Sequence, residues 1–327
     1  YMDAAVNADD VVFVASPGGQ LSGKIRVPGD KSISHRSIML GSLADGITEV
    51  EGFLEGEDAL ATLQAFRDMG VVIEGPHHGR VTIHGVGLHG LKPAPGPIYL
   101  GNSGTSMRLL SGLLAAQRFD SVLTGDASLS KRPMNRVAKP LRAMGAVIET
   151  GPEGRPPLTI RGGQSLKGLN YTLPMASAQV KSSLLLAGLY AEGRTAVTEP
   201  APTRDHTERM LRGFGCPVEV VDATVAVESG HALLATRIEV PGDISSAAFF
   251  LVAASIAEGS ELLLEHVGIN PTRTGVIDIL RLMGADITLE NLREVGGEPV
   301  ADLRVRAAPL KGIEIPEELV PLAIDEF

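Results

Sequence analysis

One pattern recurs four times along the chain and constrains its fold more than any other feature. Each copy begins with Pro or Gly and small polar residues, and continues as an apolar stretch rich in Leu and Ala. Most copies then turn at Gly into a short β-branched segment. A polar opening is typical of a helix N-cap and a glycine of a helix end, so each copy predicts a helix followed by a strand. The four copies begin at Val27, Gly101, Pro174 and Val240.

A second helical pattern follows each copy and ends in glycine before further apolar segments. The helix-ending glycines are Gly70, Gly145, Gly215 and Gly284, which lie 75, 70 and 69 residues apart. The unit therefore reads helix, strand, helix, strand, strand. Repetition at this period predicts an α/β protein built from repeated units, with helices covering one face of each sheet.

A fifth copy begins near the end of the sequence. The segment IEIPEELVPLAIDEF resembles IEVPGDISSAAFF, with Pro316 in the place of Pro241, and the sequence ends at Phe327. A helix without its following strand cannot bury its apolar face. We therefore expect this chain to be a piece of a longer polypeptide, or one half of a split protein.

Length and charge exclude several classes of protein. A chain of 327 residues is long for a single core and predicts two domains. The net charge of −10 argues against a general nucleic-acid binder, but a small anionic ligand senses only the local field. No apolar run approaches the ~20 residues that span a membrane, and the N-terminal segment lacks the pattern of a signal peptide. We therefore expect a cytoplasmic protein with no membrane partner.

The cysteine and histidine content predicts no metal site. Cys216 is the only cysteine, and its place after a helix-ending glycine predicts a small buried residue. The histidines around a predicted hairpin lack the helical i, i+4 spacing of a metal site. These histidines are His77, His78, His84 and His89.

Polar residues and cations gather at the predicted helix starts. PGDKSISHR places Lys31 at a helix start, with Ser32 and Arg36 on one helix face. GNSGTSMR contains Gly104, where an oxyanion could approach the main chain because no side chain intervenes. Free N–H groups at helix starts favour anions, and Lys and Arg add charge-assisted hydrogen bonds. Taken alone, either start is equally typical of an ordinary solvated helix cap.

Three further helix starts have the same character, and together the five change this interpretation. Their polar residues are Lys131, Arg132 and Arg136 in SLSKRPMNR, Ser177, Gln179 and Lys181 in MASAQVKSS, and Arg204, Asp205 and His206 in TRDHTER. Such starts recur at equivalent places of a repeated unit in an acidic chain. They predict that helix N-termini converge on a shared anionic ligand, and two separate phosphates or carboxylates would use this much positive charge.

These motifs together resemble the 5-enolpyruvylshikimate-3-phosphate synthase (3-phosphoshikimate 1-carboxyvinyltransferase) family. The resemblance covers the chain from about Val14 onward and rests on PGDKSISHR, GNSGTSMR, KRPMNR, MASAQVKSSLLLAG, TRDHTE and IDEF, in that order. KRPMNR, ASAQVKS and TRDHTE resemble the second class of the family, which includes glyphosate-tolerant members. The chain would correspond to the N-terminal three quarters of such an enzyme.

The resemblance implies the two-domain enolpyruvyl transferase fold, with three βαβαββ units in each domain. In this sequence, residues 29–240 would form a complete domain of three units. Residues 1–28 plus 241–327 would form a partial second domain that lacks its C-terminal part. VPGD occurs at both Val27 and Val240, which fits crossings between the domains near Pro28 and Pro241.

The resemblance also implies a reaction and its residues. The enolpyruvyl group of phosphoenolpyruvate would pass to the 5-hydroxyl of shikimate 3-phosphate with release of phosphate, a step of aromatic amino acid biosynthesis in the shikimate pathway. Lys31 and Asp325 would be catalytic, with Asp325 accepting the hydroxyl proton. The residues assigned to shikimate 3-phosphate are Lys31, Ser32, Arg36, Ser177, Ala178 (main chain), Gln179, Arg204 and Asp325. Those assigned to phosphoenolpyruvate are Lys31, Gly104, Arg132 and Gln179. No metal or organic cofactor is implied.

Members of the family carry further acidic and basic groups beyond the point that matches Phe327. We therefore expect this chain alone to be nearly inactive, to bind shikimate 3-phosphate weakly, and to have a complementary C-terminal fragment as partner. Glyphosate is the expected inhibitor. Glycine at position 104 removes one route to tolerance, in which a side chain there clashes with glyphosate.

Three other functions compete with this one. An enolpyruvyl transferase acting on UDP-N-acetylglucosamine usually uses a cysteine on a mobile loop near the second or third repeat, where this chain has none. An inactive anion-binding fragment would share the polar helix starts without turnover. RNA-terminal phosphate cyclases share the repeat fold, but the acidic charge and an aromatic content of 4% disfavour them.

Overall fold

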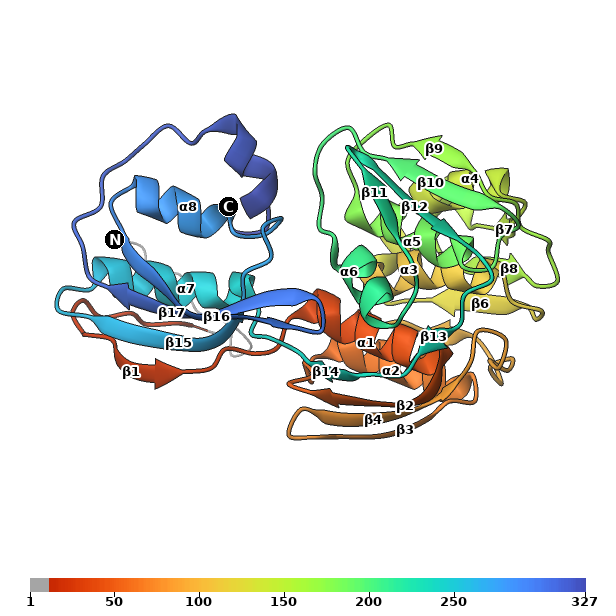
Figure 1. The fold of residues 1–327 in the computed structure, drawn as a ribbon, viewed down its shortest axis with the longest axis horizontal. Helices are drawn as coiled ribbons and strands as arrows, with labels where there is room; N and C mark the ends of the chain where they lie inside the picture. The colour runs from red at the N-terminus through yellow and green to blue at the C-terminus, as the bar shows by residue number, and fades with distance from the viewer. Residues whose placement is uncertain (1–11) are drawn as a thin grey trace, which may run out of the picture.

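The computed structural model describes residues 12–327, and its strands form four sheets of one design (Figure 1). In each sheet a leading strand runs parallel to the second, and an antiparallel pair follows. One sheet has the order β5-β6-β8-β7, from β5 (Ile98–Tyr99), β6 (Ser121–Thr124), β7 (Val147–Glu149) and β8 (Leu158–Arg161). The next has the order β9-β10-β12-β11, from β9 (Asn170–Thr172), β10 (Arg194–Thr198), β11 (Glu219–Val221) and β12 (Thr224–Glu228). The predicted α/β architecture of repeated units is confirmed, and each unit has the leading strand of the βαβαββ unit that the resemblance implies.

The first and last units exchange their leading strands. β1 (Ser22–Ile25) comes first in the chain but pairs with β15 (Glu261–Gly268) of the last unit. β14 (Arg237–Glu239) comes just before the last unit but pairs with β2 (Ala44–Glu51) of the first. The chain therefore crosses twice between these two sheets. Their other strands are β3 (Val72–His77), β4 (Arg80–Val86), β13 (Leu233–Leu234), β16 (Asp286–Val295) and β17 (Glu298–Arg306).

The two crossings pair with each other through their main chains. The N–H of Asp30 donates to the carbonyl of Pro241 at 2.8 Å, and the N–H of Asp243 donates to the carbonyl of Pro28 at 2.9 Å. A Cβ on Gly29 would lie 2.1 Å from a neighbouring carbonyl oxygen. Glycine is needed there because the main chain of Gly52, just after β2, approaches too closely for a side chain.

The first helix of each of the three units within residues 31–228 is buried on nearly every side. These helices are α1 (Lys31–Leu43), α3 (Gly104–Ala115) and α5 (Ala178–Gly188). Small residues allow close packing: a Cβ on Gly112 of α3 would lie 2.0 Å from the carbonyl oxygen of Ser183 on α5. The second helices are amphipathic, with one charged face. They are α2 (Glu57–Asp68), α4 (Asn135–Ala143) and α6 (His206–Gly213).

An arginine near the end of each second helix fastens it to the strand that follows. In all four units this arginine donates to the carbonyl six residues later and lies three residues before the predicted helix-ending glycine. The pairs are Arg67–Ile73, Arg142–Ile148, Arg212–Val218 and, on α8 (Gly275–Leu282), Arg281–Ile287. All four glycines have positive φ, between 82° and 107°, which confirms the predicted helix ends.

The buried apolar side chains form two separate cores, which appear as two lobes in Figure 1. One core draws its residues from Ile33 to Val240. The other takes Val27 together with residues from Ile244 to Val305. Among residues 12–327, no helix is both long and apolar enough to cross a membrane.

The helix α7 (Ile244–Ile256) differs from the other first helices. It is apolar all round, yet it buries only one face, which packs on β15 and β17. Phe249 is 79% exposed and Ile256 67% exposed, and Phe250 and Val252 are also partly open. A helix that is apolar on every side is expected to be covered on every side.

The expected helix of a fifth copy is a 3₁₀ helix, Glu317–Ala323, with no strand between it and β17. Pro321 lies inside it and lacks the N–H that an α-helix would need. The 3₁₀ helix packs on the start of α8 at Gly275, where a Cβ would lie 2.8 Å from the main chain of Leu322. This contact fixes the position of Asp325.

We predict that Gly112→Ala destabilises the protein by about 1–3 kcal/mol, because the added methyl group overpacks the contact between α3 and α5. Chemical denaturation would measure the change in the free energy of unfolding. Gly96→Ala is the control, because nothing lies within 4 Å of a Cβ at that position. Equal stability of the two variants would contradict this account of helix packing.

Candidate active site

Most of the predicted site residues lie at the starts of α1, α3 and α5. Asp30, Ser103 and Ser177 cap these helices, each accepting a hydrogen bond from the N–H three residues later. The first helical residues are Lys31, Gly104 and Ala178. Helix starts carry free N–H groups and a partial positive charge, so each of them favours an anion.

Three arginines gather around Gly104. A Cβ at this position would lie 3.0 Å from a guanidinium nitrogen of Arg108 and 3.1 Å from one of Arg132. Burial lowers the pKa of Arg108, and the charges of Arg132 and Arg136 lower it further. Within residues 12–327, none of the three has a carboxylate oxygen within 4.0 Å. The nearest carboxylate contact is indirect, because Asn102 accepts from Arg132 and donates to Asp126, so the start of α3 holds arginines without a directly paired carboxylate among the described residues.

Gln179 joins the start of α5 to this arginine cluster. Arg108 donates to its side-chain oxygen at 2.5 Å, and its amide nitrogen donates to Thr105 at 3.0 Å. Arg132 donates to Asn102 at 2.5 Å. The predicted residues Gly104, Arg132 and Gln179 are therefore brought together.

Arg36 is buried between α1, α5 and α6 and is only 5% exposed. It donates to the carbonyl of Ser32 at 2.9 Å, to Thr207 at 2.7 Å and to Ser182 at 3.0 Å. Burial lowers the pKa of Arg36 to about 10, so the side chain stays charged at neutral pH. The guanidinium charge of Arg36 therefore lies next to the first turn of α1, on the side that faces α5 and α6.

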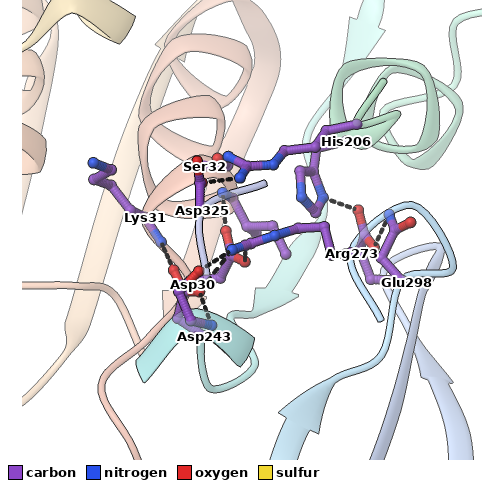
Figure 2. Close-up of polar contacts among 12 residues, drawn as sticks. Asp30, Lys31, Ser32, His206, Asp243, Arg273, Glu298 and Asp325 are labelled. Carbon is purple, nitrogen blue, oxygen red and sulfur yellow. Dashed lines mark hydrogen bonds and ion pairs between the residues drawn. The ribbon is translucent and has the colours of Figure 1, made fainter. Parts of the chain in front are cut away.

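Lys31 points to a carboxylate that the sequence did not suggest. Its ammonium lies 3.9 Å from Asp58 on α2, and its side chain is half exposed. Its N–H donates at 3.1 Å to Asp243, which belongs to the other crossing. The contact with Asp243 therefore ties the start of α1 to the other crossing, as Figure 2 shows.

Arg204 and Asp325 form an ion pair between the loop before α6 and the C-terminal segment. Burial lowers the pKa of Arg204, and Arg273 lowers it further, against the opposing charges of nearby carboxylates. Arg204 lies in the part of the chain that forms one core, whereas Asp325 follows the residues that form the other. The pair brings a candidate base and a candidate phosphate ligand into direct contact.

Lys181 forms buried ion pairs with two glutamates, and its side chain is only 1% exposed. Its ammonium lies 3.1 Å from Glu199 and 2.7 Å from Glu208. Glu199 in turn accepts from Thr203, next to Arg204. Lys181 therefore anchors the loop that carries Arg204.

Two side chains that might do acid–base or nucleophilic chemistry are inert in this structure. Burial lowers the pKa of His35 to about 3, with Arg36 and Lys31 adding to the effect, so the imidazole stays neutral. Burial raises the pKa of Cys216, which is 1% exposed, so its predicted buried position is confirmed.

Sequence reasoning missed two arginines of this region. Arg108 lies one helical turn after Gly104 in GNSGTSMR, so helical spacing could have identified it. Arg273 contacts Asp30 across 243 residues of sequence, and no local pattern signals such a contact.

Comparison with known proteins identifies the family. Residues 15–327 match the family EPSP synthase (3-phosphoshikimate 1-carboxyvinyltransferase). A 3-phosphoshikimate 1-carboxyvinyltransferase of Alkalilimnicola ehrlichii is 72% identical over 96% of this chain and 71% of the relative. One of Methylococcus capsulatus is 70% identical over 97% of this chain and 73% of the relative.

A solved structure agrees with these relatives. The EPSP synthase of Acinetobacter baumannii is 66% identical, with a TM-score of 0.90, and the match covers 94% of this chain and 70% of that one. The resemblance read from the motifs is thus confirmed at the level of the family. The chain belongs to the EPSP synthase (3-phosphoshikimate 1-carboxyvinyltransferase) family.

Proposed function

We propose that this chain transfers the enolpyruvyl group of phosphoenolpyruvate to the 5-hydroxyl of shikimate 3-phosphate and releases phosphate. The observation that carries the proposal is the cluster of Arg108, Arg132 and Arg136 at the start of α3, which has no carboxylate partner among the described residues. Cations that lie close together without a paired carboxylate favour the binding of an anion that neutralises them. The names of the relatives agree with this chemistry.

Phosphoenolpyruvate is assigned to Lys31, Gly104, Arg132 and Gln179. Three of these lie together at the starts of α3 and α5. Bare main chain at Gly104 leaves room for an oxyanion, and guanidinium groups bind phosphate and carboxylate through paired N–H donors. Arg108 joins this set as the partner of Gln179.

Shikimate 3-phosphate is assigned to the starts of α1 and α5 and to the loop before α6. Its proposed ligands are Lys31, Ser32, Arg36, Ser177, Ala178, Gln179, Arg204 and Asp325. Arg204 pairs with Asp325 in the structure, so a phosphate bound by Arg204 would replace that carboxylate as its partner. Arg36 would act through its charge beneath the site and through Ser32.

The proposed chemistry needs a base and a stabilised leaving group. The 5-hydroxyl oxygen bonds to C2 of phosphoenolpyruvate as a proton adds to C3. C3 then loses a proton as the bond from C2 to the phosphate oxygen breaks, which restores the double bond and releases phosphate. Asp325 accepts the hydroxyl proton as the oxygen attacks. Lys31 and the arginine cluster stabilise the charge on the departing phosphate. The proposal assigns no metal or organic cofactor.

The domain division proposed here is residues 29–240, and 1–28 plus 241–327, of which 1–11 lie outside the described residues. The two cores support this division. The exposed apolar face of α7 supports the proposal that further chain covers the second domain, because the equivalent helices α1, α3 and α5 are covered on nearly every side. KRPMNR, ASAQVKS and TRDHTE favour the second class of the family, and glyphosate stays the proposed inhibitor.

We predict that Arg132→Gln weakens the binding of phosphoenolpyruvate about 10-fold or more, because a charge-assisted hydrogen bond contributes roughly 1.5–3 kcal/mol. Isothermal titration calorimetry would measure the dissociation constant in the presence of shikimate 3-phosphate. Arg118→Gln is the matched control, because Arg118 is exposed and follows α3 at its far end. Equal effects of the two substitutions would contradict the role of the cluster.

We predict phosphate release from the two substrates when the chain is supplemented with the part of the Alkalilimnicola ehrlichii relative that lies C-terminal to the match. We expect little release from the chain alone, because the face of α7 would stay uncovered. Lys31→Ala should abolish the restored turnover. Full activity of the chain alone would contradict the need for a complementary segment, and no release in either case would contradict the proposed function.

A further inference from the structure

Arg273 lies at the centre of the double crossing and is only 5% exposed (Figure 2). It belongs to the loop between β15 and α8. One guanidinium nitrogen donates to Asp30 at 2.7 Å, and another donates to Asp243 at 3.1 Å and to Ser245 at 2.6 Å. A single side chain therefore binds the polar residues that begin both crossing helices.

These two aspartates hold the start of α1. Asp30 accepts the N–H of Ile33 with its other oxygen, which caps the helix. Asp243 accepts the N–H of Lys31 at 3.1 Å. Arg273 therefore fixes both acceptors that orient the first turn of α1, where Lys31 and Ser32 lie.

The same guanidinium reaches the C-terminal segment. Glu326 lies 3.9 Å from Arg273 and also accepts from Ser245. Asp325 is the next residue along the chain, and the 3₁₀ helix before it packs on α8 at Gly275, two residues after Arg273. One short loop thus holds both the start of α1 and the segment that carries Asp325.

The carboxylates around Arg273 stabilise the positive charge of its guanidinium group. Burial opposes the charge, but Asp30, Asp243 and Glu326 outweigh burial and raise the pKa of Arg273. Arg204 is a second cation that interacts with the same three carboxylates. Without Arg273, three buried carboxylates would lose their shared partner.

We propose that Arg273 is a positioning residue that holds Lys31 and Asp325 in register across the two crossings. This inference rests on the proposed function, which assigns both residues to the reaction. Arg273 acts through Asp30, Asp243 and Glu326, and it lies beneath the first turn of α1.

The geometry requires arginine in particular. The two aspartates bind different nitrogens of one planar group, and a lysine ammonium offers a single point charge that cannot span both in the same way. Arg273→Lys should therefore restore the charge and much of the stability, but only part of the positioning.

The test measures binding of shikimate 3-phosphate to the full chain by isothermal titration calorimetry. We expect Arg273→Gln to weaken binding about 10-fold or more and Arg273→Lys to give an intermediate loss. Arg281→Gln is the matched control, with an expected change below about 2-fold, because Arg281 on α8 donates only to the main-chain carbonyl of Ile287 in β16 of the same unit.

A second readout does not depend on the substrate. Amide hydrogen exchange at Lys31 and Ile33 should become faster in Arg273→Gln than in Arg281→Gln, because their acceptors lose their anchor.

The outcomes distinguish a failure of the proposed function from a failure of the positioning role of Arg273. Wild-type affinity and unchanged exchange in Arg273→Gln would overturn the inference. If the wild-type chain does not bind shikimate 3-phosphate, the proposed function fails, and exchange at Lys31 and Ile33 still decides whether Arg273 holds this helix start. If Arg273→Gln does not fold, Arg273→Lys carries the comparison, and its equality with wild type in both readouts would overturn the inference.

Discussion

The double crossing between the two cores is the constraint on which the rest of the structure depends. The exchange of leading strands forces two segments of the chain through one narrow place, where Asp30 and Asp243 begin helices of different cores. Two carboxylates buried this close repel each other unless a cation lies between them. Arg273 supplies that cation, and the start of α1 takes its orientation from the result.

Cationic side chains without a carboxylate partner lie at and beside the start of α3 in this acidic chain. Each helix start is positively polarised by its own N–H groups, and the side chains add charge where the polarisation is strongest. The arginines near the ends of the second helices bind main-chain carbonyls and Arg273 binds carboxylates. Arg108, Arg132 and Arg136, in contrast, have no carboxylate partner in the part of the chain that the structure describes. This contrast distinguishes structural arginines from arginines that await an anion.

The repeat allowed much of the fold to be predicted from the sequence. The glycines that end the second helices gave the period, and polar caps marked the helix starts near Asp30, Ser103 and Ser177. The exchange of β1 and β14 could not be predicted from local pattern, because each strand follows the pattern of the unit that it precedes in the chain. For the same reason Arg273 was missed, since its partners are distant in sequence. The buried state of Lys181 depends on Glu199 and Glu208, which no spacing rule connects.

A crystal structure of the protein with shikimate 3-phosphate tests the central claim, that the helix starts converge on one anionic ligand, most directly. The account predicts that the phosphate contacts Arg204 and the start of α5, and that Asp325 no longer pairs with Arg204 and faces the 5-hydroxyl. A ligand bound away from the starts of α1 and α5, or an intact pair between Arg204 and Asp325 with the ligand in place, would contradict it.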